Sequence, residues 1–195
     1  SAATAVSGWV STGTRASALI TGLSDDATYH WQARTVDRTG RASEWTPFGG
    51  NAETAADFRV AIPHPPDAPA SLAQLRGDGT TPIGAGAITD QATVLFRGLV
   101  SDADSGDQVR LEVEVLPVGV AFTNTASGAS ALVAGGSLAS ATVTGLADNV
   151  QYHWQARAVD QTGRASGWAA FGANAESAPD VRIALAPSRL VVLAQ

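Results

Sequence analysis

The chain contains the same passage twice, and this internal repeat limits what it can fold into. Residues 21–62 and 144–185 align without a gap at an offset of about 123 residues, and about 27 of the 42 aligned positions are identical. The shared register also extends backwards, to Ala16-Ser17-Ala18 and Ala139-Ser140-Ala141. Residue 1 then corresponds to residue 124, so the first copy lacks any equivalent of residues 64–123. We therefore expect a window on a longer repetitive protein, with one complete unit and part of another.

The hydrophobic pattern is that of β-strands. In residues 150–160 (VQYHWQARAVD), Tyr152 and Trp154 fall on one face, and His153 and Gln155 fall on the other. This alternation is typical of a half-buried strand. Similar short runs occur at residues 92–100, 109–116, 139–146 and 181–185, and clusters of turn-forming residues separate them. No segment of helical length has a 3.6-residue period, so the pattern predicts an all-β sandwich.

Proline marks the boundary between the units. Residues 63–69 (PHPPDAP) should form a semi-rigid linker, because proline restricts both its own backbone and that of the preceding residue. We predict an incomplete repeat over residues 1–63, a complete repeat over residues 64–187, and the start of a further unit or a donor strand over residues 188–195. The candidate donor strand, which would pair with the sheet edge of a neighbour, comprises Leu190, Val191, Val192, Leu193 and Ala194.

Composition excludes several classes of site and partner. The chain has no cysteine, which excludes disulfide bonds and thiolate metal sites. Its basic residues are all arginine, are dispersed, and are outnumbered by acids to give a net charge of −6, so nucleic acid is not an expected partner. No apolar run approaches the length of a membrane span. Neither a Ser/His/Asp set nor a catalytic carboxylate pair stands out, and we expect that the protein is not an enzyme.

The repeated motif T-G-L-x-D-x-x-x-Y-H-W-Q-A-R-A-V-D-x-T-G-R-A-S-x-W resembles the E–F–G region of fibronectin type III domains, which are immunoglobulin-like β-sandwiches. The resemblance implies tandem fibronectin type III-like sandwiches, the first one incomplete. It also implies that Tyr29 and Tyr152 are corner tyrosines, whose hydroxyls bond to upstream backbone. The chain departs from the family at residues 123–141, which form a longer connection than usual. The family implies an extracellular or cell-surface spacer, adhesive or accessory module.

Residues 101–108 (SDADSGDQ) form the most chemically suggestive segment. Asp102, Asp104 and Asp107 surround a glycine turn, and carboxylates at such spacing are ligands that Ca²⁺ prefers. The segment also resembles loops of bacterial cadherin-like surface repeats. The alternative is a solvated turn in which aspartate and serine bond their own backbone. These three aspartates are the candidate calcium ligands, and Ca²⁺ is the one candidate cofactor.

Other motifs favour structural interpretations. Arg76-Gly77-Asp78 matches an integrin-binding tripeptide but also reads as a simple turn. We expect His30 and His153 to be exposed on a strand face, because few further ligands accompany them. We expect the tryptophans at repeated positions to pack in the core. Trp9 has no counterpart in the second copy and is the best candidate for an exposed aromatic residue.

The sequence thus predicts a structural or adhesive extracellular repeat that spaces or assembles a surface protein or filament. Its expected partners are adjacent repeats or other copies of itself. Two alternatives remain open, an accessory module of a secreted polysaccharide-degrading enzyme and a calcium-stiffened adhesin repeat. An incomplete sandwich exposes an apolar face and unpaired edges. Three ways of covering this face remain open: strands from upstream in the same chain, a strand from another chain, or an unrelated partner.

Overall fold

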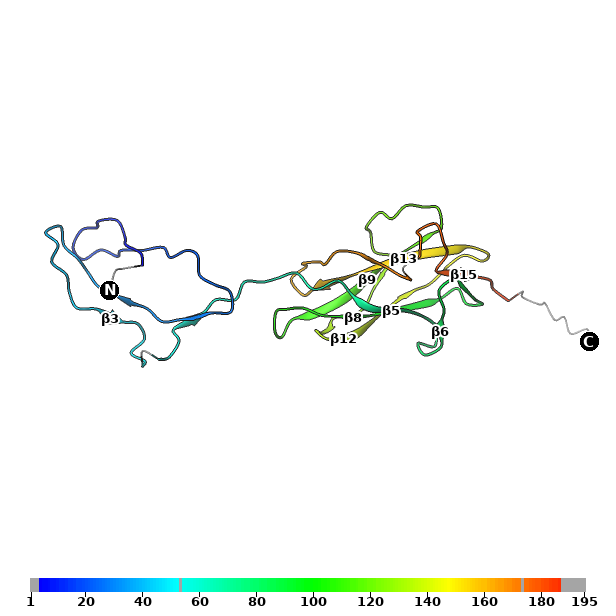
Figure 1. Cartoon of the computed structure of the whole chain (residues 1–195), viewed down its shortest axis with the longest axis horizontal. Coiled ribbons are helices and arrows are strands. Elements are labelled where there is room, and N and C mark those ends of the chain that lie inside the picture. Colours follow the sequence, from blue (N-terminus) through cyan, green and yellow to red (C-terminus); the bar gives the residue numbers. More distant parts are fainter. Residues whose placement is uncertain (1–3, 53, 173, 187–195) are drawn as a thin grey trace, which may run out of the picture. The chain divides into compact units, whose positions relative to one another are not determined.

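The computed structural model describes residues 4–52, 54–172 and 174–186, which belong to two compact units (Figure 1). The first unit is Ser1–Pro63 and the second is His64–Gln195. The described residues form strands and turns but no helix, which confirms the prediction of an all-β chain. Within these residues there is accordingly no helix long and apolar enough to cross a membrane. The candidate donor strand, residues 190–194, lies outside the described residues.

The second unit contains two β-sheets. The first sheet has the strand order β12-β8-β5-β6, and the second has the order β10-β9-β13-β15-β7, with β11 also paired to β9 and β14 to β13. All pairings are antiparallel except that of β15 with β7, which is parallel. The strands are β5 (Ala70–Arg76), β6 (Pro82–Ile83), β7 (Ala87–Thr89), β8 (Val94–Val100), β9 (Gln108–Pro117), β10 (Gly128–Ala129), β11 (Val133–Ala134), β12 (Ser137–Val143), β13 (Gln151–Asp160), β14 (Ala169–Ala170) and β15 (Val181–Ile183).

One hydrophobic core lies between the two sheets. Phe96 from β8 packs against Trp154 from β13, with ring centroids 4.7 Å apart. Alternate residues along β8, β9, β12 and β13 join the same buried cluster, so each strand turns one face towards it. Figure 1 shows the sheets as two layers, one with β9 and β13 and the other with β8 and β12. The second unit is therefore β-sandwich-like.

The other face of β13 is also covered, so the prediction that His153 is exposed was wrong. Only 3% of His153 is exposed, and its ring stacks on Phe122 with centroids 4.2 Å apart. Its ring nitrogens lie 2.9 Å from a Glu176 carboxylate oxygen and 2.9 Å from the Val120 carbonyl oxygen. The segment after β9 folds back over the sheet, a tertiary contact that the alternation within β13 does not encode.

Glu114 on β9 holds this covering segment in place. Its carboxylate accepts hydrogen bonds from the backbone N–H and hydroxyl of Thr123, from the backbone N–H of Asn124, and from the side-chain amide of Gln155. Burial raises the pKa of Glu114, but these hydrogen bonds outweigh it and hold the pKa below its usual range. The long connection from residue 123 to residue 141 is thereby anchored to the sheet, and it contributes β10 and β11.

The first unit repeats the local structure of the second. Its strands are β1 (Thr28–Tyr29), β2 (Gln32–Ala33), β3 (Thr46–Pro47) and β4 (Phe58–Arg59). The register of β1 with β4 is that of β13 with β15, and the register of β2 with β3 is that of β13 with β14, each at the repeat offset. The isolated bridge between Val36 and Ala42 likewise matches the bridge between Val159 and Ala165.

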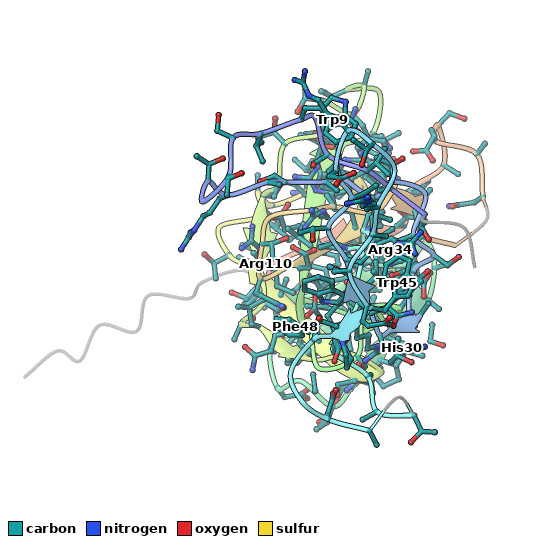
Figure 2. All side chains as sticks on the ribbon, turned by 90° about the vertical axis from the view of Figure 1, so that its left-hand side faces the viewer. Trp9, His30, Arg34, Trp45, Phe48 and Arg110 are labelled. Carbon is teal, nitrogen blue, oxygen red and sulfur yellow. The ribbon has the colours of Figure 1, made fainter. Side chains whose placement is uncertain are left out.

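Side-chain contacts are repeated as well. The Asp57 carboxylate accepts a hydrogen bond of 2.9 Å from the Trp31 backbone, as Asp180 does from Trp154. Trp31 stacks on Phe48 and Trp154 stacks on Phe171, both with centroids 4.8 Å apart. Arg34 lies over Trp45 at 4.6 Å (Figure 2), and Arg157 lies over Trp168 at 4.7 Å. The repeated sequence therefore sets these local contacts, whatever surrounds it.

The units differ in burial. Trp154 is 1% exposed, whereas its counterpart Trp31 is 43% exposed. The prediction that tryptophans at repeated positions pack in the core is therefore correct for Trp154 but wrong for Trp31, and also for Trp45 and Trp168, which are half-buried beneath arginine side chains. For Trp31 the reason is that β5 and β8, which cover Trp154, have no counterpart among the described residues of the first unit.

The tyrosines offer a matched test of this difference. The Tyr152 hydroxyl accepts a hydrogen bond from the backbone N–H of Ala147 (2.9 Å), and the Tyr29 hydroxyl accepts one from Ser24 (2.8 Å). Tyr152 is buried, so we expect Tyr152→Phe to lower the free energy of unfolding by about 1 kcal/mol, because the N–H loses its partner. Tyr29→Phe, at a solvated bond, should change it by less than about 0.5 kcal/mol. Urea denaturation followed by circular dichroism measures both changes in the free energy of unfolding. Equal losses for the two variants would contradict the difference in burial between the two hydrogen bonds.

Candidate functional site

Three aspartates converge at the end of the second unit where β8 leads into β9. Asp102 and Asp107 come from the loop between these strands. Asp160 ends β13, and the pairing of β13 with β9 sets it opposite Val109, directly after the loop. One ligand oxygen from each carboxylate lies within 4.8 Å of the other two. We call Asp102, Asp107 and Asp160 the acidic triad.

Asp160 is the most buried member of the triad, at 1% exposed. Its Oδ1 accepts hydrogen bonds from the Thr162 backbone (2.7 Å), the Thr162 hydroxyl (2.8 Å) and the Arg164 backbone (2.9 Å). Burial raises the pKa of Asp160, but the hydrogen bonds of this turn outweigh it and the net pKa is below the usual range. The carboxylate is therefore ionised at neutral pH.

The two carboxylate oxygens of Asp102 also differ in their hydrogen bonding. Oδ1 accepts a hydrogen bond of 3.0 Å from the backbone N–H of Asp104, which shapes the loop. Oδ2 is buried and has no hydrogen-bond partner within the described part of the chain, and the same is true of Asp160 Oδ2. Both residues thus present one oxygen that the described part of the chain leaves without a partner.

Asp104, which the sequence analysis grouped with Asp102 and Asp107, is not part of the triad. Its carboxylate accepts a hydrogen bond of 2.7 Å from the backbone N–H of His64, and its other oxygen lies 3.0 Å from His64 Nδ1. The side-chain bond with His64 is the main cause that lowers the pKa of Asp104. Asp104 thus bonds His64 while Asp102 and Asp107 converge with Asp160, a difference that the spacing of the aspartates in the sequence does not encode.

Asp160 was missed by the sequence analysis because its place in the triad depends on strand register. It stands 53 residues beyond Asp107, and only the pairing of β9 with β13 brings the two together. The available signal was the R-A-V-D ending of the strand, which occurs in the first unit as R-T-V-D with Asp37 at the equivalent position. Asp37 makes the same turn contacts, through Oδ1 to Thr39 and Arg41.

The Arg76-Gly77-Asp78 tripeptide has the geometry of a turn. The Asp78 carboxylate accepts hydrogen bonds from the backbone N–H groups of Thr80 and Thr81, both at 2.8 Å, and from the Thr81 hydroxyl. These bonds, the Thr81 side chain foremost, lower the pKa of Asp78. The Arg76 guanidinium donates to Asp90 at 2.7 Å. The two charged side chains of the motif are thus engaged within the unit.

The exposed aromatic residues lie in the first unit. Trp9 is 64% exposed and lies 5.8 Å from the Arg38 guanidinium, in agreement with its predicted exposure. His30 is also exposed, and Figure 2 shows it in the same unit as Trp45 and Phe48. Trp31 and Phe48 form an exposed stacked pair. Trp31 and Phe48 correspond to Trp154 and Phe171, on the side of the sheet that β5 and β8 cover in the second unit, whereas His30 corresponds to His153 on the opposite face.

The chain matches no protein-family model, and a comparison with curated proteins finds no significant match.

Proposed function

We propose that this chain is a non-enzymatic structural repeat of an extracellular or cell-surface protein, built from fibronectin type III-like sandwich units that space or assemble that protein. The observation that carries the proposal is that the two units share strand register and side-chain contacts over about 40 residues. Repetition of a whole structural unit extends a chain by a fixed length each time, which suits a spacer better than a single binding pocket.

The open face of the first unit supports assembly between half-units. Residues that are buried in the second unit have apolar counterparts in the first, of which Ile20, Trp31 and Phe58 are exposed and Val60 is half-buried. The pairs are Val143 with Ile20, Trp154 with Trp31, Val181 with Phe58 and Ile183 with Val60. An exposed apolar face of this kind marks an interaction site or an aggregation hazard.

The partner proposed for this face is a segment with the sequence pattern of residues 64–123. In the second unit this segment supplies β5, β8 and β9, which cover Trp154 and complete both sheets. Because the first unit retains the apolar positions that such strands contact, the same pattern should fit its open face. The partners of this protein are thus adjacent repeats or other copies, joined by sheet completion.

Protease shaving of intact source cells tests the proposed location. We expect trypsin to release peptides that end at arginines in exposed turns, such as Arg38 and Arg164, before any cytoplasmic marker appears. Cells treated with buffer alone are the control for lysis. Peptides that appear only together with the cytoplasmic marker would contradict a surface location.

A further inference from the structure

We propose that the acidic triad, Asp102, Asp107 and Asp160, is a binding site for a hard divalent cation, and that Ca²⁺ is the ion it fits. The three side chains bring ligand oxygens within 4.8 Å of one another. Ca²⁺ binds oxygen at about 2.3–2.6 Å, so two oxygens on one ion are never more than about 5.2 Å apart. The observed separation therefore allows all three carboxylates to bind a single ion.

The two unsatisfied oxygens point independently to a ligand. Asp160 Oδ2 and Asp102 Oδ2 are buried without a hydrogen-bond partner in the described part of the chain. A buried carboxylate oxygen normally has a partner, because leaving it unsatisfied is destabilising. The other oxygen of each residue is occupied by backbone N–H groups of its own turn, which fixes the side chain in place. A cation bound by the two Oδ2 atoms would satisfy both.

The surroundings suit an ion that takes many oxygen ligands. Two members of the triad, Asp102 and Asp107, line a hollow of about 280 Å³, together with residues 104–106 and 108 and with Ala134 and Gly135. Water in this hollow can complete a shell of six to eight oxygens, as Ca²⁺ requires. No arginine or histidine in the described residues forms an ion pair with the triad. The Arg164 side chain, from the adjoining turn, donates to the Thr162 hydroxyl instead.

A bound ion would join parts of the unit that are distant in sequence. It would tie the loop between β8 and β9 to the end of β13, and so link the two sheets at this end of the second unit. Binding to the folded state alone raises stability by mass action. Calcium binding at this site would thus stiffen the second unit. This inference concerns the second unit alone and does not depend on how the first unit is completed.

Calorimetry of the intact chain, stripped of metal with a chelator, tests the proposal. At Ca²⁺ concentrations ten times the dissociation constant, we expect the unfolding temperature of the second unit to rise by about 5 °C. Isothermal titration should give one ion bound per chain. Asp107→Asn and Asp160→Asn should each abolish the shift, because each removes a charged ligand while keeping the side chain's shape. Asp107 makes no side-chain hydrogen bond in the described structure, so its variant should fold even if Asp160→Asn does not.

Two matched variants serve as controls. Asp37→Asn alters the repeat equivalent of Asp160, and Asp104→Asn alters the loop aspartate that bonds His64. Both should retain the calcium shift within about 1 °C, given the precision with which small stability changes are resolved. The absence of any shift at 10 mM Ca²⁺, about ten times the weakest dissociation constants of extracellular sites, would overturn the proposal. A shift that survives in both Asp107→Asn and Asp160→Asn would also overturn it.

Discussion

Replacement of Trp154 by alanine is expected to lower the free energy of unfolding of the second unit by about 3–5 kcal/mol, the usual loss for a large aromatic residue in a core. Trp154 is 1% exposed, lies between Phe96 and Phe171, and donates its indole N–H to Gln74 Oε1 at 3.1 Å. The variant therefore leaves a cavity and an unpaired buried amide oxygen. A loss of this size is a large fraction of the stability of an ordinary domain.

The same replacement at Trp31 should have almost no effect, although Trp31 has the same neighbours in sequence. Trp31 keeps the stacking on Phe48 and the backbone bond to Asp57, but 43% of it is exposed. We expect the unfolding transition of the chain to change by less than about 0.5 kcal/mol. Urea denaturation followed by far-ultraviolet circular dichroism avoids the loss of a fluorophore. A loss at Trp31 comparable with that at Trp154 would mean that the first unit already has a closed core.

The strands could be predicted from the sequence, but the contacts between distant segments could not. Alternation located β13 at residues 150–160 and β8 at residues 92–100, close to their observed bounds, because the pleat makes the pattern local. The burial of His153 and Gln155 depends instead on a segment that folds over from residues 118–127. That contact joins positions about 30 residues apart and leaves no periodic trace in either strand.

The candidate site could likewise be predicted only in part from the sequence. The loop aspartates were visible as a motif, and two of the three, Asp102 and Asp107, lie in the triad. The third member of the triad is Asp160 and not Asp104. The pairing of β9 with β13 brings Asp160 to the loop, whereas Asp104 bonds His64. Local turn chemistry is readable from sequence, but a site shared between two strands requires their register.

Completion of the first unit is also expected to have a large effect, namely a gain in its stability. A hybrid chain in which residues 64–123 are followed directly by residues 1–63 restores the order of the complete unit, since residue 1 corresponds to residue 124. The hybrid places β5, β8 and β9 next to the open face. Trp31 should then occupy the environment of Trp154, with Phe96 and Gln74 as neighbours. Its burial would contribute about as much stability as that of Trp154.

Three further chains make the comparison decisive. Residues 64–186, the complete second unit, should unfold cooperatively and serve as the positive control. Residues 1–63 alone should show no cooperative transition, because half a sandwich buries too little apolar surface to offset its conformational entropy. Trp31→Ala in the hybrid should cost about 3–5 kcal/mol, in contrast to its negligible effect in the intact chain.

Differential scanning calorimetry of the hybrid chain tests the central claim most directly, namely that the first unit is a half-sandwich completed by a segment like residues 64–123. The account predicts a single cooperative unfolding peak for the hybrid, as for residues 64–186, together with a blue shift of tryptophan emission. A hybrid that melts without a cooperative peak, like residues 1–63 alone, would contradict it.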